Sequence, residues 1–281
     1  MIIIKLSSGL GNQLFMYAFS KLLESQLKIS PCFDDSYYKA DPSRHSELNI
    51  LYPNYPTAQI KLNPVGKRNV IRFFCKFYHK CRRTYKIINE KDEFNIKLLY
   101  SQKTYYFNGY WQHEKYYNFF KADWFVPKET LPTILGEIKE KILNAPNPVA
   151  IHIRRGDYFN NQYMKQFGIC TEVYFKNAMS CMEEMEQSIE YFVFSDDIQW
   201  VRTHLTFHRQ FYMIENHQVN SFWYIYLMSL CRHNIISNST FSWWGAYLNS
   251  NPQKEVFYPS KWVKDESYTL AMNSWIKIKV D

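Results

Sequence analysis

Short apolar runs that end in polar residues alternate with longer stretches of helical character along the chain. In the first half, the pattern predicts strands at residues 2–6 and 29–33, a helix over residues 14–26 between them, and a strand end near residues 108–112 before a helix from Glu114. The first three elements form a βαβ beginning, which is typical of a parallel sheet.

The same pattern repeats in the second half. Predicted strands lie at residues 149–153, 189–194, 211–214, 234–237 and 256–258, and helices are predicted near residues 171–186, from residue 198, near residues 221–231 and after residue 245. Strands that alternate with helices imply a parallel sheet. Each half is therefore predicted to be an α/β unit.

Prolines mark the passage between these halves. Pro127, Pro132, Pro146 and Pro148 occur there, and residues 144–148 are the predicted linker. We therefore expect an N-terminal domain over residues 1–145 and a C-terminal domain over residues 146–281, with a cleft between them.

The composition is that of a globular protein. With 46% hydrophobic residues, the 281-residue chain can bury one large core or two modest ones. The apolar run at the start is too short for a signal peptide, and no run of about 18 apolar residues follows, so we expect the protein in the cytosol. Its six cysteines form no CxxC pair, which argues against a zinc site or a disulfide framework.

A net charge of +8 favours an anionic partner. Much of the charge lies in residues 66–91, where lysines and arginines are interleaved with aromatic residues. As a helix, this basic–aromatic segment is suited to rest on an anionic membrane surface. An ordinary solvated helix with its aromatic side chains in the core explains the pattern equally well. Nucleic-acid binding ranks third, because no known binding module surrounds the segment.

The sequence His152-Ile153-Arg154-Arg155-Gly156-Asp157-Tyr158 follows directly on a predicted buried strand. Guanidinium groups bind phosphate oxygens in a bidentate manner, and open α/β sheets place their ligands at the carboxyl ends of the strands. Arg154 and Arg155 are therefore candidates for binding a multiply charged anion. The alternative is that an arginine pairs with Asp157 and only fixes the loop.

Gly9-Leu10-Gly11-Asn12 joins a predicted strand to a helix. Glycines at such a junction let the backbone approach a ligand, and the amides at the helix start attract anions. The dinucleotide-binding fingerprint needs a third glycine where this chain has Leu14. A plain tight turn explains the motif as well.

Ser195-Asp196-Asp197 ends another predicted strand. These residues are preferred helix N-caps, and as a binding site an aspartate would accept hydrogen bonds from sugar hydroxyls or a base. The chain contains no Asp-x-Asp, which argues against a metal-bridged diphosphate site. The charge of Arg154 and Arg155 could replace a metal ion in stabilising a departing diphosphate. His204 and His208 lack a third ligand and are interpreted as surface residues.

Small hydroxyl residues occupy a third junction, Asn238-Ser239-Thr240-Phe241-Ser242. Their hydroxyls and the helix-start amides are suited to hold phosphate oxygens. A simple capping sequence is the alternative, and the adjacent Trp243-Trp244 is typical of core packing.

Taken together, these segments resemble glycosyltransferase family 11, the α-1,2-fucosyltransferases, in a bacterial form. The residues that carry the resemblance are Gly9-Leu10-Gly11-Asn12-Gln13, Gly109-Tyr110-Trp111-Gln112, His152 to Tyr158, Phe194-Ser195-Asp196-Asp197 and Asn238 to Trp244, in this order over nearly the whole chain. The resemblance implies a GT-B fold, in which two Rossmann-like domains with parallel sheets face each other across a cleft. The N-terminal domain would then lie on the acceptor side and the C-terminal domain would bind the nucleotide sugar.

The resemblance further implies a GDP-β-L-fucose donor and metal-independent, inverting transfer to the 2-hydroxyl of a galactose. Arg154 would bind the β-phosphate and stabilise the GDP leaving group, Arg155 and Asp157 would shape that loop, and His152 would lie beside the donor. Asn12 and Gly11 would reach the diphosphate or fucose from the opposite domain. The phosphates and ribose would be held by Ser239, Thr240, Phe241 and Ser242. Asp157 is the one candidate for a general base, although its neighbouring arginines favour a structural role.

Two positions depart from the pattern of this family. Tyr224 stands where an aspartate is usual, and that acid would read the guanine edge in related fucosyltransferases. A tyrosine cannot accept both hydrogen bonds from guanine. Phe167 stands where a histidine is often found, in the expected acceptor pocket.

We therefore expect a cytosolic fucosyltransferase that modifies a lipid-linked O-antigen unit, with the basic–aromatic segment keeping it at the inner face of the membrane. Its partners would be a nucleotide-sugar donor and a galactose-containing acceptor, without nucleic acid, metal or further cofactor. The rivals are the same fold with another nucleotide-sugar donor, a sugar- or nucleotide-binding protein without turnover, and a basic nucleic-acid binder.

Overall fold

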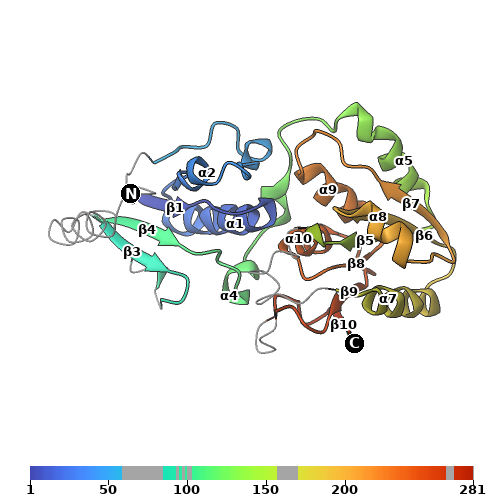
Figure 1. Cartoon of the computed structure of the whole chain (residues 1–281). Coiled ribbons are helices and arrows are strands. Elements are labelled where there is room, and N and C mark those ends of the chain that lie inside the picture. Colours follow the sequence, from blue (N-terminus) through green and yellow to red (C-terminus); the bar gives the residue numbers. More distant parts are fainter. Residues whose placement is uncertain are drawn as a thin grey trace. The chain divides into compact units, whose positions relative to one another are not determined.

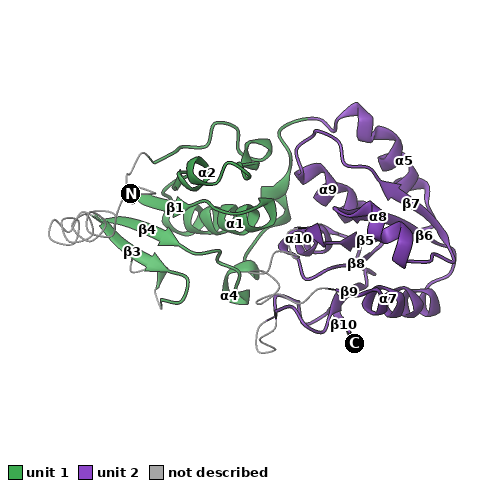
Figure 2. Ribbon diagram, viewed as in Figure 1, with its two compact units in different colours: residues 1–129 green, residues 130–281 purple. Residues whose placement is uncertain are grey.

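The computed structural model describes residues 1–58, 85–92, 95–96, 99, 103–156, 170–263 and 269–280. These residues form two compact units, residues 1–129 and 130–281 (Figure 2). The division lies sixteen positions before the expected one at residue 145, because α5 (Gly136–Asn144) packs against α9 (Phe222–Leu230) of the second unit. Residues 144–148 join α5 to β5 (Asn147–Ile153) inside that unit.

The first unit is built on a four-stranded parallel sheet with the order β2-β1-β4-β3 (Figure 1). Its strands are β1 (Ile2–Lys5), β2 (Cys32–Asp34), β3 (Tyr85–Asn89) and β4 (Thr104–Asn108). The long helix α1 (Leu10–Leu27) connects β1 to β2, which is the βαβ beginning that the sequence predicts.

Aromatic side chains join α1 to the sheet and to the loop after β4. The ring of Phe19 stacks on that of Trp111 at 4.3 Å and meets the edge of Phe107 at 5.4 Å. Short helices complete the unit: α2 (Tyr37–Ala40), η1 (Leu48–Ile50), α4 (Glu114–Tyr117) and η3 (Ala122–Phe125). This packing fixes α1 against β4 and the loop that follows it.

The second unit contains a six-stranded parallel sheet with the order β10-β9-β8-β5-β6-β7. Besides β5, its strands are β6 (Ile189–Ser195), β7 (Gln210–Ile214), β8 (His233–Ile235), β9 (Val256–Pro259) and β10 (Ile276–Ile278). The helices are η4 (Thr133–Leu135), α5, α7 (Glu172–Met185), α8 (Ile198–His204), α9 and α10 (Thr240–Leu248).

Helices cover both faces of this sheet. Val149 and Ile151 of β5 belong to a buried cluster with Tyr174 of α7 and Val201 of α8. Because successive strand residues point to opposite faces, His152 faces the other side, where its ring lies 5.4 Å from that of Phe241 in α10. The expectation of two α/β units, each with a parallel sheet, is confirmed.

Three expectations differ from the structure. Helix α1 begins at Leu10, so Gly11 and Asn12 lie in its first turn, and residues 240–245 form the start of α10 and not a loop before it. Strand β10 follows β9, with which the series was expected to close. Of the basic–aromatic segment, only residues 85–91 are described, and residues 85–89 form β3.

Candidate functional site

The predicted phosphate-binding residues gather at the carboxyl edge of the second sheet. Ile153 at the end of β5 lies opposite Ser195 at the end of β6 in the parallel register. Arg154 and Arg155 follow the first of these strands, and Asp196 and Asp197 follow the second. Parallel pairing therefore places two cations beside two carboxylates at the edge where open α/β sheets bind ligands.

Asp196 organises the loop after β5. Its Oδ1 accepts a hydrogen bond from the Arg155 backbone N–H at 2.8 Å, and its Oδ2 accepts one from Gly156 at 3.0 Å. Oδ2 also lies 2.9 Å from Arg154 Nη1. A Cβ on Gly156 would lie only 2.9 Å from the same oxygen, so the loop needs a glycine to approach this closely. Asp196 thus orients Arg154, and its predicted contact with a ligand stays a prediction.

Arg155 and Asp197 have mainly structural contacts. The Arg155 guanidinium lies 3.9 Å from the centre of the Trp200 ring, and its Nε lies 3.5 Å from Asp197 Oδ2. Burial lowers the pKa of Arg155, which Asp197 opposes, and an arginine stays protonated at any working pH. Asp197 Oδ1 accepts from the Trp200 backbone N–H at 2.9 Å and so caps α8. The capping interpretation of Asp197 is confirmed, and Arg154 is the more exposed of the two arginines.

Ser237 links the arginine loop to the junction before α10. Its hydroxyl donates to the His152 carbonyl at 2.8 Å and accepts from the Arg154 backbone N–H at 3.1 Å. The sequence reasoning missed Ser237, since a serine inside a predicted strand carries no sign of a partner 83 residues away.

The hydroxyl residues at the start of α10 serve different purposes. Ser239 is the N-cap and accepts from the Phe241 backbone N–H at 3.3 Å. The buried Ser242 hydroxyl donates to the carbonyls of Ser237 and Ser239 at 3.2 Å each, so it stabilises the junction from within. Thr240 is partly exposed in the first turn. The site is therefore a capped helix start beside the arginine loop, which together suit an anion.

His152 is the buried histidine of this edge. Burial and, to a lesser degree, the charge of Arg154 lower its pKa to about 3. Its Nδ1 has no hydrogen-bond partner among the residues that the structure describes. The ring is thus neutral near pH 7 and leaves the positive charge of this edge to Arg154 and Arg155.

The first unit holds Gly11 and Asn12 at the carboxyl edge of its own sheet. Ser8 has a left-handed backbone (φ 64°), and Gly9 precedes the first turn of α1 as its N-cap. The buried Gln13 side chain donates to the Ser8 carbonyl at 3.0 Å and the His45 carbonyl at 2.9 Å. These contacts fix the turn that presents Asn12.

A second loop of the first unit, residues 109–112, reaches the same turn. Gln112 Nε2 donates to Asn12 Oδ1 at 2.7 Å, and the Ser8 and Tyr110 hydroxyls lie 2.8 Å apart. Glu90 accepts from the backbone N–H groups of Tyr110 and Gln112 at 2.8 Å each. The sequence reasoning quoted this loop but missed Glu90, which precedes it by about 20 residues and carries no local motif.

Of the two positions that depart from the family pattern, Tyr224 and Phe167, the structure describes only Tyr224. Tyr224 is buried in α9, where its hydroxyl oxygen accepts a hydrogen bond from the His217 backbone N–H at 2.6 Å. Burial raises the pKa of Tyr224, and the hydrogen bond from His217 opposes this. Phe167 and the predicted residue Asp157 lie outside the described residues.

Within the described part of the chain, no group of three or more His, Cys, Asp or Glu side chains is placed to hold a metal ion. His204 instead interacts through Nδ1 with the Thr203 hydroxyl at 2.7 Å. The described helices also include none with the length and apolar character needed to cross a bilayer.

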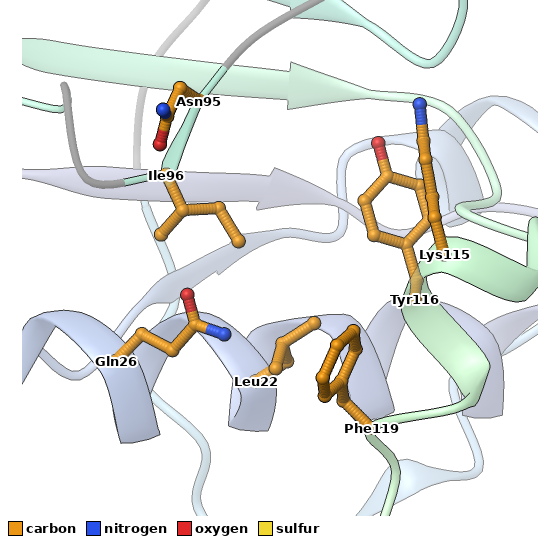
Figure 3. Close-up of a pocket in the computed structure, with 7 residues that line it drawn as sticks. All are labelled: Leu22, Gln26, Asn95, Ile96, Lys115, Tyr116 and Phe119. Atoms are coloured by element: carbon orange, nitrogen blue, oxygen red, sulfur yellow. The ribbon is translucent and has the colours of Figure 1, made fainter.

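A cavity of about 350 Å³ lies elsewhere in the first unit, between α1 and α4 (Figure 3). Its lining residues include Leu22 and Gln26 of α1, Lys115 of α4 and Phe119. At about 1.5 Å of rise per helical residue, Leu22 lies roughly 15 Å along α1 from Asn12. None of the predicted site residues lines this cavity.

Comparisons with known proteins agree with this arrangement. The family model described as Glycosyl transferase family 11 matches residues 1–278. The O-antigen biosynthesis glycosyltransferase WbnK of Escherichia coli is 32% identical over 97% of this chain and 99% of its own. An α-1,2-colitosyltransferase of Escherichia coli is 30% identical over 99% of each chain. A galactoside 2-α-L-fucosyltransferase of Caenorhabditis elegans is 28% identical over 92% of this chain and 71% of its own.

The family model and these relatives, over two α/β units with an arginine loop at a sheet edge, identify the chain as a glycosyltransferase. The chain belongs to glycosyltransferase family 11.

Proposed function

We propose that this protein transfers L-fucose from GDP-β-L-fucose, with inversion and without a metal ion, to the 2-hydroxyl of a galactose in a glycan precursor such as an O-antigen unit. The observation that carries the proposal is the Arg154 guanidinium, which Asp196 holds at 2.9 Å beside the capped start of α10. One mobile cation would be a poor anion site, whereas an oriented guanidinium beside helix-start amides matches a diphosphate.

Departure of the diphosphate is the step that this site would assist. Negative charge grows on the β-phosphate as the bond to the sugar breaks, and a preorganised cation stabilises that charge without reorganising. In this proposal Arg154 binds the β-phosphate, and Ser239 and Thr240 contact the other phosphate oxygens or the ribose. The neutral His152 lies beneath the donor as a packing surface.

The relatives support the sugar and the linkage. One carries the name galactoside 2-α-L-fucosyltransferase, and another, similar over nearly its whole length, carries the name α-1,2-colitosyltransferase. Colitose differs from L-fucose only by lacking the 3-hydroxyl. The second candidate function is therefore transfer of colitose from its nucleotide-linked form to the same kind of acceptor.

A direct transfer assay tests the proposal. Purified protein is incubated with GDP-fucose or nucleotide-linked colitose and a galactose-terminated acceptor, with EDTA or with magnesium, and the linkage of the product is determined by NMR. A 1,2-linked fucoside formed in EDTA is the expected result. Transfer of colitose alone would select the second candidate, and dependence on magnesium would refute the metal-free mechanism.

Arg154→Ala is the matching variant for the diphosphate site. We expect turnover to fall by about 10²–10³-fold, the typical loss when one donor to a developing anion is removed. Arg209→Ala is its control, because Arg209 is exposed and pairs with Glu183 away from the site. Full activity of Arg154→Ala would overturn the assignment.

Nucleotide preference is a separate test, because Tyr224 stands where an aspartate would read guanine. Its hydroxyl oxygen already accepts from His217. A calorimetric titration with GDP, UDP, CDP and ADP, without metal, should show binding of GDP alone. Preference for another nucleotide would keep the family and replace the donor, and binding of none would favour a protein without turnover.

We also propose that the acceptor is lipid-linked and that the basic–aromatic segment, residues 66–91, holds the protein at an anionic membrane. Its sequence is the support, with cations interleaved among aromatic residues. Sedimentation with vesicles of phosphatidylglycerol and phosphatidylcholine measures this. Binding that needs the anionic lipid and weakens with salt is expected, and equal binding to neutral vesicles would refute it.

A further inference from the structure

Asn12 is held by one side chain from a distant part of the first unit. It lies in the first turn of α1, where its backbone N–H donates to the Gly9 carbonyl at 3.0 Å. Its side-chain oxygen accepts from Gln112 Nε2 at 2.7 Å, across 100 positions of sequence. With the oxygen engaged, the Nδ2 group of Asn12 has no hydrogen-bond partner among the described residues, and the residue is partly exposed.

The loop that carries Gln112 is built to keep that side chain in place. Glu90 accepts from the backbone N–H groups on both sides of Trp111, at 2.8 Å each. Trp111 itself has a left-handed backbone (φ 62°), which non-glycine residues rarely adopt. Its buried ring stacks on Phe19 of α1 at 4.3 Å, so the packing offsets the cost of this backbone.

Gly109 shows how closely the loop approaches its support. A Cβ at this position would lie 2.5 Å from Glu90 Cβ. Strand register adds a further constraint, because Asn89 and Asn108, the residues before Glu90 and Gly109, are partners in β3 and β4. The Glu90 carboxylate, the left-handed backbone of Trp111 and the close approach of Gly109 to Glu90 all constrain residues 109–112, the loop that carries Gln112.

We infer that Gln112 is a positioning residue for Asn12 and sets the direction of its amide, so that Asn12 presents an N–H donor to an oxygen of the nucleotide sugar. Primary amides have a donor end and an acceptor end. Gln112 donates to Oδ1, the acceptor atom of the Asn12 amide, so Nδ2 of Asn12 is left to donate to the ligand. The inference rests on the proposed function and on the expectation, from the family resemblance, that Asn12 contacts the donor substrate.

Gln112→Glu tests the direction of the amide while keeping its size. A carboxylate can only accept, so it would bond to Asn12 Nδ2 and turn the Asn12 oxygen toward the ligand. We expect turnover to fall roughly tenfold or more, the effect of losing about one hydrogen bond in the transition state. Gln26→Glu is the matched control, since Gln26 is exposed on the same helix and has no contact with Asn12.

A double-mutant cycle separates positioning from a general structural role. In the Asn12→Ala background, Gln112→Glu should change turnover by less than about twofold, because the group it reorients is gone. An equal loss in both backgrounds would overturn the inference, as would a Gln112→Glu enzyme with the turnover of the control. GDP and GDP-fucose titrations then identify the oxygen: weaker binding of both indicates a phosphate, and weaker binding of GDP-fucose alone indicates the sugar.

An NMR measurement keeps the inference testable if fucose is not the donor. In protein with ¹⁵N-labelled asparagine, the Asn12 side-chain amide is identified by its loss in Asn12→Ala. Gln112→Glu should shift this signal downfield, since Nδ2 becomes a donor to a carboxylate. An unchanged signal would refute the positioning role whatever the substrate, whereas failure of wild-type transfer with a shifted signal would refute only the proposed function.

Discussion

Asp196→Asn is the substitution that most directly tests how the arginine loop is held. In the native protein the two carboxylate oxygens accept from two different backbone N–H groups, those of Arg155 at 2.8 Å and Gly156 at 3.0 Å. Asparagine has one acceptor oxygen. Its amide nitrogen must therefore face one of these N–H groups, or the Arg154 guanidinium, donor against donor.

The expected magnitude follows from these contacts. A hydrogen bond to a charged group contributes about 1.5–3 kcal/mol. The ion pair to Arg154 is about a quarter exposed on both sides, and such a pair contributes only about 0.2–1 kcal/mol because water screens it. Together, the loss of both contacts should destabilise the closed loop by about 2–4 kcal/mol, which is roughly a 30- to 700-fold change in its opening equilibrium.

Hydrogen exchange measured by mass spectrometry reports this opening on peptides that contain residues 154–156. Exchange at the amides of Arg155 and Gly156 should accelerate by about the same factor in Asp196→Asn, provided that they exchange by local opening. The control is Asp197→Asn, which removes the same charge beside the loop. Asp197 caps α8 through one oxygen, which asparagine replaces equally well, and its other oxygen lies 3.5 Å from the Arg155 side chain and not from the two backbone N–H groups that Asp196 holds. Unchanged exchange in Asp196→Asn, or an equal effect of both variants, would refute the reasoning.

Three other perturbations probe the rest of the molecule. Because the native pKa of His152 is about 3 and the unfolded value is near 6.5, the unfolded chain binds more protons between these limits. The free energy of unfolding should therefore decrease as the pH is lowered through this window, by up to about 1.4 kcal/mol per pH unit from this group. Urea titrations should show this pH dependence in wild type and not in His152→Asn. The same dependence of the free energy of unfolding on pH in both proteins would contradict the burial of a neutral ring. Gly109→Ala should lower the free energy of unfolding by about 1–3 kcal/mol, since a Cβ would overlap Glu90. In the same denaturation assay Gly136→Ala, with open space around it at the start of α5, should raise the free energy of unfolding by up to about 1 kcal/mol. A similar loss in both variants would count against the close contact. Lys254→Met should cost about 1–3 kcal/mol in thermal or urea unfolding, because the partly buried ammonium donates to the carbonyls of Ala246 and Asn249 at the end of α10. A variant as stable as wild type would show that this cap contributes nothing.

The sequence alone determined the class of the fold and predicted the sheet edge at which the candidate site residues gather. Strand and helix periodicities are local properties, so short apolar runs and helical stretches could be recognised one at a time. Their alternation implied parallel sheets, and both sheets are parallel. The polar residues that follow β5 and β6 were also expected at the same edge of the sheet, because neighbouring parallel strands end at one edge.

Only the tertiary structure decided which partner each polar side chain has. Arg154 pairs with Asp196 and Arg155 with Asp197, while Ser242 bonds within its own junction. The link from Glu90 through Gln112 to Asn12 spans 100 positions and has no periodicity that a sequence pattern could show. Such pairings arise when packing brings distant backbone donors and side chains within hydrogen-bond reach, and buried polar groups must then find partners there. Local sequence therefore specified the elements and their polar ends, and long-range packing specified which of those ends bond to other parts of the protein.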